Sequence, residues 1–258
     1  MADLRNYQMR AGAGARVDAG IDEGLRAYMI KVYNLMALGL AITGVAALGT
    51  SMLATTGDPS AAVNTLPNGT LLTSFGAVLY GSPLRWVVML APLGLVFFLS
   101  ARVHTMSLSA AQTTFWVFAA LMGLSLSSIF LVYTTGSIVQ TFFITAASFG
   151  ALSLFGYTTK RDLTGWGSFL IMGVFGLIIA MIVNIFLASP ALQFAISAIG
   201  VLVFAGLTAY DTQKIKEMYF DGDEVLVAGR KAIMGALTLY LDFINLFTFL
   251  LSFLGNRE

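Results

Sequence analysis

The sequence is dominated by seven apolar stretches, each long enough to cross a lipid bilayer as a helix. About 20 mainly apolar residues, at about 1.5 Å per residue, span the roughly 30 Å of hydrocarbon in a membrane. Short polar or glycine- and proline-containing segments separate the stretches, which cover approximately residues 30–53, 86–103, 112–133, 137–157, 166–188, 191–211 and 232–254. We therefore predict an all-α membrane protein, a bundle of seven transmembrane helices.

The composition argues against several other classes of protein. Hydrophobic residues make up 58% of the 258 residues and charged residues 10%, against about 45–50% and 25% in an ordinary soluble domain. The formal net charge is +1 and no tract is rich in lysine or arginine, so we expect no binding to nucleic acid. The chain has no cysteine, which excludes disulfides and thiolate metal sites.

The basic residues predict the orientation, because short loops on the cytoplasmic side retain lysine and arginine. A cytoplasmic N-terminus places most basic residues in cytoplasmic segments, namely Arg5, Arg10, Arg16, Arg26, Lys31, Arg102, Lys160, Arg161, Lys214, Lys216, Arg230 and Lys231. Only Arg85 and Arg257 then lie outside. Whether the last stretch crosses fully or re-enters stays open. A full crossing places Arg257 outside and a re-entrant segment keeps it inside, and this one charge does not decide between them.

The polar residues 1–27 lack the early apolar core of a cleavable secretory signal. We therefore predict a polar cytoplasmic N-terminal segment, residues 1–27, followed by one transmembrane domain, residues 28–258. The protein is expected in the cell membrane, which is the inner membrane where the host has two, and the lipid bilayer is its first partner.

Two aspartates lie in apolar stretches, where a carboxylate costs about 2.5–3.5 kcal/mol or more to insert. Asp242 has apolar neighbours on both sides, and Asp211 lies at the cytoplasmic end of the sixth stretch. The sixth and seventh stretches are consecutive and antiparallel, so the two carboxyl groups can meet. Their depths match only if the last helix begins below the membrane surface or if water enters from the cytoplasm. The structural alternatives are a hydrogen bond between helices for Asp242 and an interfacial charge for Asp211.

If they meet, the two carboxyl groups form a proton-sensitive site. Carboxylates within a few ångströms repel each other when both are ionised, so they titrate as a pair. Arg102, at the cytoplasmic end of the second stretch, is the best available counter-charge, and its alternative role is a plain cytoplasmic anchor. Ca²⁺ prefers about 6–8 oxygen ligands, so Asp211 and Asp242 alone predict a transient Ca²⁺ contact and no resident cofactor.

No pattern in the chain predicts an enzyme or a catalytic residue. Paired aspartates on neighbouring spans occur in intramembrane aspartyl proteases, and Tyr210-Asp211 matches one half of that signature. The residues before Asp242 do not form the Gly-x-Gly-Asp half. A nucleophile elbow, a His-Glu-x-x-His motif and a phosphate-binding glycine loop are also missing from the sequence.

Three regions carry a family resemblance: residues 91–102, residues 121–133, and the pair YDTQ at 210–213 with ALTLYLDFINLF at 236–247. They are similar to bacterial members of the Bax inhibitor-1 family, also called the transmembrane Bax inhibitor motif family. The resemblance runs from about residue 26 to the end of the chain.

The resemblance implies a bundle in which the last helix is surrounded by the others. It also implies a pH-sensitive leak of calcium or other cations, controlled by Asp211 and Asp242, with Arg102 latching the closed form. Some bacterial members of the family look instead like modulators of membrane-bound proteases. The chain could then be a non-transporting regulator with a membrane protease partner and residues 1–27 as a contact segment. A proton-coupled carrier of small solutes is a third interpretation.

Overall fold

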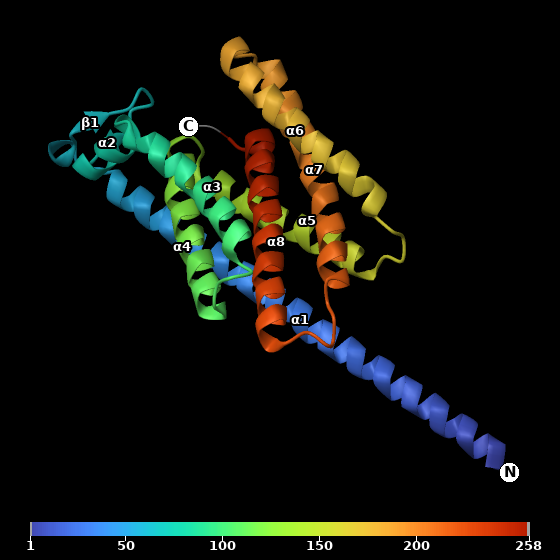
Figure 1. The fold of residues 1–258 in the computed structure, drawn as a ribbon. Coiled ribbons are helices and arrows are strands. Elements are labelled where there is room, and N and C mark those ends of the chain that lie inside the picture. Colours follow the sequence, from blue (N-terminus) through green and yellow to red (C-terminus); the bar gives the residue numbers. More distant parts are fainter. Residues whose placement is uncertain (1, 257–258) are drawn as a thin grey trace.

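The computed structural model describes residues 2–256, with side chains from residue 23 onward, and it is built almost entirely of helices (Figure 1). Within these residues, 7 helices are long and apolar enough to cross a membrane. They belong to α1 (Ala2–Ala54), α3 (Leu84–Arg102), α4 (Leu108–Leu126) with its extension η2 (Ser127–Leu131), α5 (Thr135–Thr158), α6 (Thr164–Leu187), α7 (Pro190–Glu217) and α8 (Val225–Leu254). The predicted seven-helix membrane bundle is confirmed.

The connection between α1 and α3 folds into a small cap at the end of the bundle opposite the N-terminus (Figure 1). This hairpin cap, residues 55–83, contains η1 (Pro59–Ala61), the antiparallel strands β1 (Asn64–Thr65) and β2 (Leu71–Leu72), and α2 (Ser74–Gly81). Gly69 lies in the turn between the strands with a φ of 86°, a conformation that glycine adopts without steric cost. The cap covers one end of α3 and α4.

The last helix, α8, lies in the middle of the bundle. It packs against α1, α4, α5 and α7, and 56% of its most apolar window is buried, more than in any other spanning helix of the described residues. Its far end reaches the start of α5, where the backbone N–H of Thr134 donates to the carbonyl of Asn256 at 3.2 Å. The last helix therefore runs the full length of the bundle, and the central position predicted for it is confirmed.

The start of α1 and the end of α8 lie at opposite ends of the bundle, and so do the first and last described residues (Figure 1). Which end faces the cytoplasm stays a prediction from the basic residues. The backbone of α1 continues as one helix from Ala2 into the first span. The division at residue 27 is a prediction about polarity, and no break in the helix marks it.

The facing ends of α7 and α8 extend beyond the predicted apolar stretches. α7 continues to Glu217, beyond residue 211, and α8 begins at Val225, ahead of residue 232. The extra turn of α7 is held by Gln213, whose amide accepts from the N–H of Leu163 and donates to the carbonyl of Arg161, both at 2.8 Å. Hydropathy detects the apolar part of a helix, so it missed these polar turns.

Glycines set the closest helix contacts. A Cβ on Gly123 of α4 would lie 2.4 Å from the carbonyl oxygen of Thr43 in α1, and a Cβ on Gly156 of α5 would lie 2.2 Å from that of Ala209 in α7. Small residues let helix backbones approach each other in membranes. The α1–α4 and α5–α7 contacts are therefore backbone contacts that a larger side chain would separate.

We expect Gly156→Ala to destabilise the protein by about 1–3 kcal/mol, because the added methyl group meets a backbone atom that cannot move aside. Gly150→Ala, on the same helix, is the matched control, since its Cβ meets nothing within 4 Å. It should leave stability unchanged or raise it slightly. Thermal unfolding in detergent measures both, and equal melting temperatures for the two variants would contradict this account of the α5–α7 contact.

Candidate functional site

The structure brings Asp211 and Asp242 together. Their carboxyl groups lie within hydrogen-bonding reach of each other across the contact between α7 and α8. Asp242 is only 4% exposed, and its Oδ2 is buried without a hydrogen-bond partner among the described residues. A hydrogen bond between two carboxyl groups needs a proton on one of them. Two carboxyl groups at this distance can share a proton, and that they do so stays a prediction.

The depths of the two residues match because α8 begins beyond the end of α7. At about 1.5 Å per residue, Asp211 lies about 9 Å before the end of α7, and Asp242 lies about 26 Å after the start of α8. The start of α8 consequently extends past its neighbour (Figure 1). Arg230 in this extension donates to the carbonyl of Met106 between α3 and α4. This is the first of the two arrangements that the sequence left open.

Close packing fixes the α7 side of the pair. Gly156 of α5 lies against Ala209, and a Cβ on Gly167 of α6 would lie 2.4 Å from the ring of Tyr210. The contacted residues, Ala209 and Tyr210, immediately precede Asp211 in the chain. Two neighbouring helices therefore press on α7 at the residues that position this carboxyl group.

Hydrogen bonds fix the α8 side. The hydroxyl of Tyr240, two residues before Asp242, is fully buried and lies 2.6 Å from the hydroxyl of Thr43 in α1. Thr43 in turn donates to the carbonyl of Ala119 in α4 at 2.8 Å. This link between α1, α4 and α8 holds the central helix in place independently of the carboxyl pair.

A chain of hydroxyl groups leads from a cavity to the α7 side of the site. The cavity has a volume of ≈ 540 Å³ and lies between α1 and α5, with Tyr33 and Ser153 in its lining.

 The hydroxyl of Tyr33 bonds that of Ser153, which lies 2.9 Å from the hydroxyl of Thr212, the residue after Asp211. Sequence analysis missed this chain, because single hydroxyl residues on three separate helices carry no sequence signature.

The structure does not bring Arg102 to the aspartates. Arg102 is exposed at the end of α3, and its side chain makes no ion pair or hydrogen bond among the described residues. The cation whose charge acts on Asp211 is Lys214, one turn further along α7. The spacing of three residues on one helix was a signal for this contact. A latch by Arg102 stays a prediction.

The pair on its own is an incomplete cage for a metal ion. Among the residues with described side chains, no group of three or more histidines, cysteines, aspartates or glutamates could hold a metal ion together. Two carboxyl groups provide few of the oxygen ligands that Ca²⁺ prefers. The site therefore suits a brief contact with a passing cation better than tight binding.

The natural absence of cysteine allows a direct test of this geometry. We expect the Asp211→Cys/Asp242→Cys double variant to be joined by a short bifunctional methanethiosulfonate, because the two side chains meet across α7 and α8. Arg102→Cys/Asp242→Cys is the matched control and should not be joined. A protease site inserted after Gly222, in the exposed connection between α7 and α8, would reveal the cross-link as fragments that stay together on a gel. A cross-link in Arg102→Cys/Asp242→Cys and none in Asp211→Cys/Asp242→Cys would contradict the geometry.

Comparison with known proteins places the chain in a family. The family model described as "Inhibitor of apoptosis-promoting Bax1" matches residues 25–258. The chain is 50% identical over 237 residues to an uncharacterized protein of Rickettsia prowazekii, covering 92% of each chain. It is 45% identical over 237 residues to the inner membrane protein YbhL of Escherichia coli, covering 91% of this chain and 94% of the relative. Together with the seven spanning helices, these matches show a multi-pass protein of the cell membrane that belongs to the Bax inhibitor-1 family.

Proposed function

We propose that this protein is a leak channel for Ca²⁺ and other cations, gated by proton binding to Asp211 and Asp242. The observation that carries the proposal is the approach of the two carboxyl groups to within hydrogen-bonding reach, at the contact of α7 with the central helix. The relatives are described as inner membrane or uncharacterized proteins, so the family supports the location and the site supports the activity.

The bound proton links α7 to α8. When the shared proton leaves, the hydrogen bond is lost and two like charges face each other in a poorly solvated place. Two unit charges about 4 Å apart repel by about 4 kcal/mol at an effective dielectric constant of about 20. A tenfold change in the ratio of two conformations needs only about 1.4 kcal/mol. Deprotonation therefore has ample energy to favour a conformation in which the two helices separate.

The surroundings of the pair fit a channel closed on one side. Beyond Asp242, α8 continues with a run of buried apolar side chains: Phe243, Ile244, Leu246, Phe247, Leu250 and Leu251. Apolar constrictions close channels by excluding water. Toward the N-terminal end, the hydroxyl chain and the cavity between α1 and α5 offer polar groups close to the pair. Separation of α7 from α8 would open the apolar half and leave two carboxylates facing the passing cation.

Ca²⁺ flux into liposomes containing the purified protein tests the proposal. We expect the flux to rise with pH, through the range in which the pair loses its shared proton. Asp211→Asn and Asp242→Asn should each lower the flux at high pH by about tenfold and flatten the pH profile, because an amide neither ionises nor repels its neighbour. If both variants keep the wild-type rate and profile, the mechanism is wrong.

Asp162→Asn is the matched control for these variants. Asp162 is exposed between α5 and α6, and hydrogen bonds from the side chain and backbone of Thr164 hold the pKa of Asp162 below its ordinary value. The carboxylate therefore stays ionised throughout the assay, and its replacement should leave the pH profile unchanged. Arg102→Gln should also leave the profile unchanged, since Arg102 does not contact the pair here. A shifted profile in Arg102→Gln would instead reveal a second conformation in which Arg102 latches the aspartates.

The same liposomes distinguish the other interpretations. A wild-type protein that gives no more flux than empty liposomes, yet changes the activity of a co-reconstituted membrane protease, would be a regulator and not a channel. Saturable counterflow of a small solute would identify a carrier. Either result would overturn the leak-channel proposal in favour of that function.

A further inference from the structure

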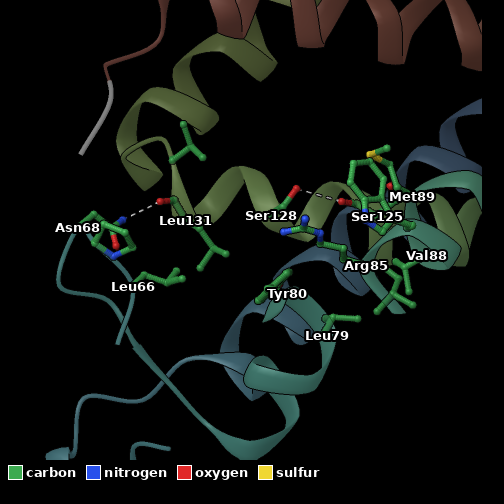
Figure 2. A pocket seen from close by; sticks show the side chains of 14 residues that line it. Leu66, Asn68, Leu79, Tyr80, Arg85, Val88, Met89, Ser125, Ser128 and Leu131 are labelled. Carbon is green, nitrogen blue, oxygen red and sulfur yellow. Dashed lines mark hydrogen bonds between the residues drawn. The ribbon is translucent and has the colours of Figure 1, made fainter. Parts of the chain in front are cut away.

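A second cavity lies beneath the hairpin cap, far from the carboxyl pair. Its volume is ≈ 660 Å³, within the range of about 300–1,000 Å³ that is usual for ligand pockets. Figure 2 shows its lining, which comes from the hairpin loop, α2, the first turns of α3 and the end of α4 with η2. The cavity is therefore formed only when the cap folds back on the bundle.

Arg85 is the cation in this cavity, and it has no anionic partner. Its guanidinium lies 5.0 Å from the ring centre of Trp86, and among the described residues it makes no ion pair or side-chain hydrogen bond. Arg85 also lies in the first turn of α3, at the positive end of the helix dipole, although the backbone N–H groups of Leu84, Arg85 and Trp86 already donate to Ser82 and Pro83. The guanidinium without an ion-pair partner therefore favours an anion.

The polar groups beside Arg85 suit an oxygen-rich anion. Ser125 and Ser128 lie near the guanidinium in Figure 2, and the Ser128 hydroxyl donates to the carbonyl of Ser125 at 3.2 Å. The Ser125 hydroxyl remains able to donate to a ligand. Burial raises the pKa of Tyr80, so this residue presents a neutral ring to the cavity while its hydroxyl bonds Ser127 at 2.8 Å.

The rest of the lining is apolar and faces the membrane. Val88 and Met89 line the cavity on α3, and Leu131 and Val132 line it at the end of η2. Met89 and Val132 are also exposed on the outside of the bundle, so the cavity continues onto the lipid-facing surface. Trp86 lies at the end of a spanning helix, the depth at which tryptophan meets lipid headgroups.

We propose that this cavity binds an anionic phospholipid, with its phosphate against Arg85 and Ser125 and an acyl chain along the apolar wall of α3 and η2. A soluble anion such as inorganic phosphate shares the headgroup chemistry. The apolar wall and its continuity with the lipid-facing surface favour the lipid, because a small anion would leave them unused.

Fluorescence of Trp86 tests the proposal, since the chain has only 3 tryptophans. In a Trp116→Phe/Trp166→Phe background, Trp86 alone reports on the cavity that it lines. Vesicles containing brominated phosphatidylglycerol should quench it more strongly than vesicles containing brominated phosphatidylcholine. The expected preference is on the order of tenfold in relative association, because the choline cation of phosphatidylcholine neutralises the headgroup, whereas phosphatidylglycerol keeps a net negative charge for Arg85. Each measurement is normalised to the same lipid without bromine.

Variants of the cation separate this site from general attraction to a charged surface. Arg85→Gln should abolish the preference, and Arg85→Lys should keep part of it, because lysine keeps the charge and loses the guanidinium fork. Lys160→Gln removes an exposed cation at the opposite end of the bundle, and this variant should keep the full preference for the anionic lipid. Equal quenching by the two lipids, or a preference that survives Arg85→Gln, would overturn the proposal. Loss of the preference on adding millimolar inorganic phosphate would assign the site to a small soluble anion and overturn the proposal of a bound lipid.

Discussion

Two carboxyl groups, one on α7 and one on the central helix, lie within hydrogen-bonding reach of each other in this protein, and a hydrogen bond between them exists only while one of them holds a proton. Asp242 lies at 4% exposure, where water cannot stabilise a charge. Because α8 packs against α1, α4, α5 and α7, a change in this one bond acts on the helix that most of the bundle surrounds. In the proposed mechanism, the proton is therefore coupled to the packing of the whole domain.

The remaining contacts hold the bundle together without the carboxyl pair. Gly156 presses on α7 beside the pair, the Tyr240–Thr43 hydrogen bond ties α8 to α1, and Gln213 fixes the end of α7 to the α5–α6 connection. These contacts contain no titratable carboxyl group, so they persist when the pair ionises.

The two ends of the bundle also differ in character. Hydroxyl groups approach the pair from the N-terminal end, and the hairpin cap adds a separate basic cavity at the other.

Hydrophobic length was sufficient to predict the seven spans, antiparallel order allowed Asp211 to meet Asp242, and the central last helix was predicted from the family resemblance. The sequence was insufficient where position depends on packing. The polar turns around Gln213 extend α7 beyond its apolar stretch, and Arg102 lies away from the aspartates although its sequence position suggested otherwise. The cavity at Arg85 is assembled from four separate segments, and their proximity has no sequence pattern.

Infrared difference spectroscopy against pH is the most direct measurement of the shared proton. The account predicts a band from a protonated carboxyl group in the wild-type protein that disappears as the pH rises and that is lost or displaced in both Asp211→Asn and Asp242→Asn. A band that neither substitution changes, or no such band in the wild-type protein, would contradict the shared proton on which the proposed gate depends.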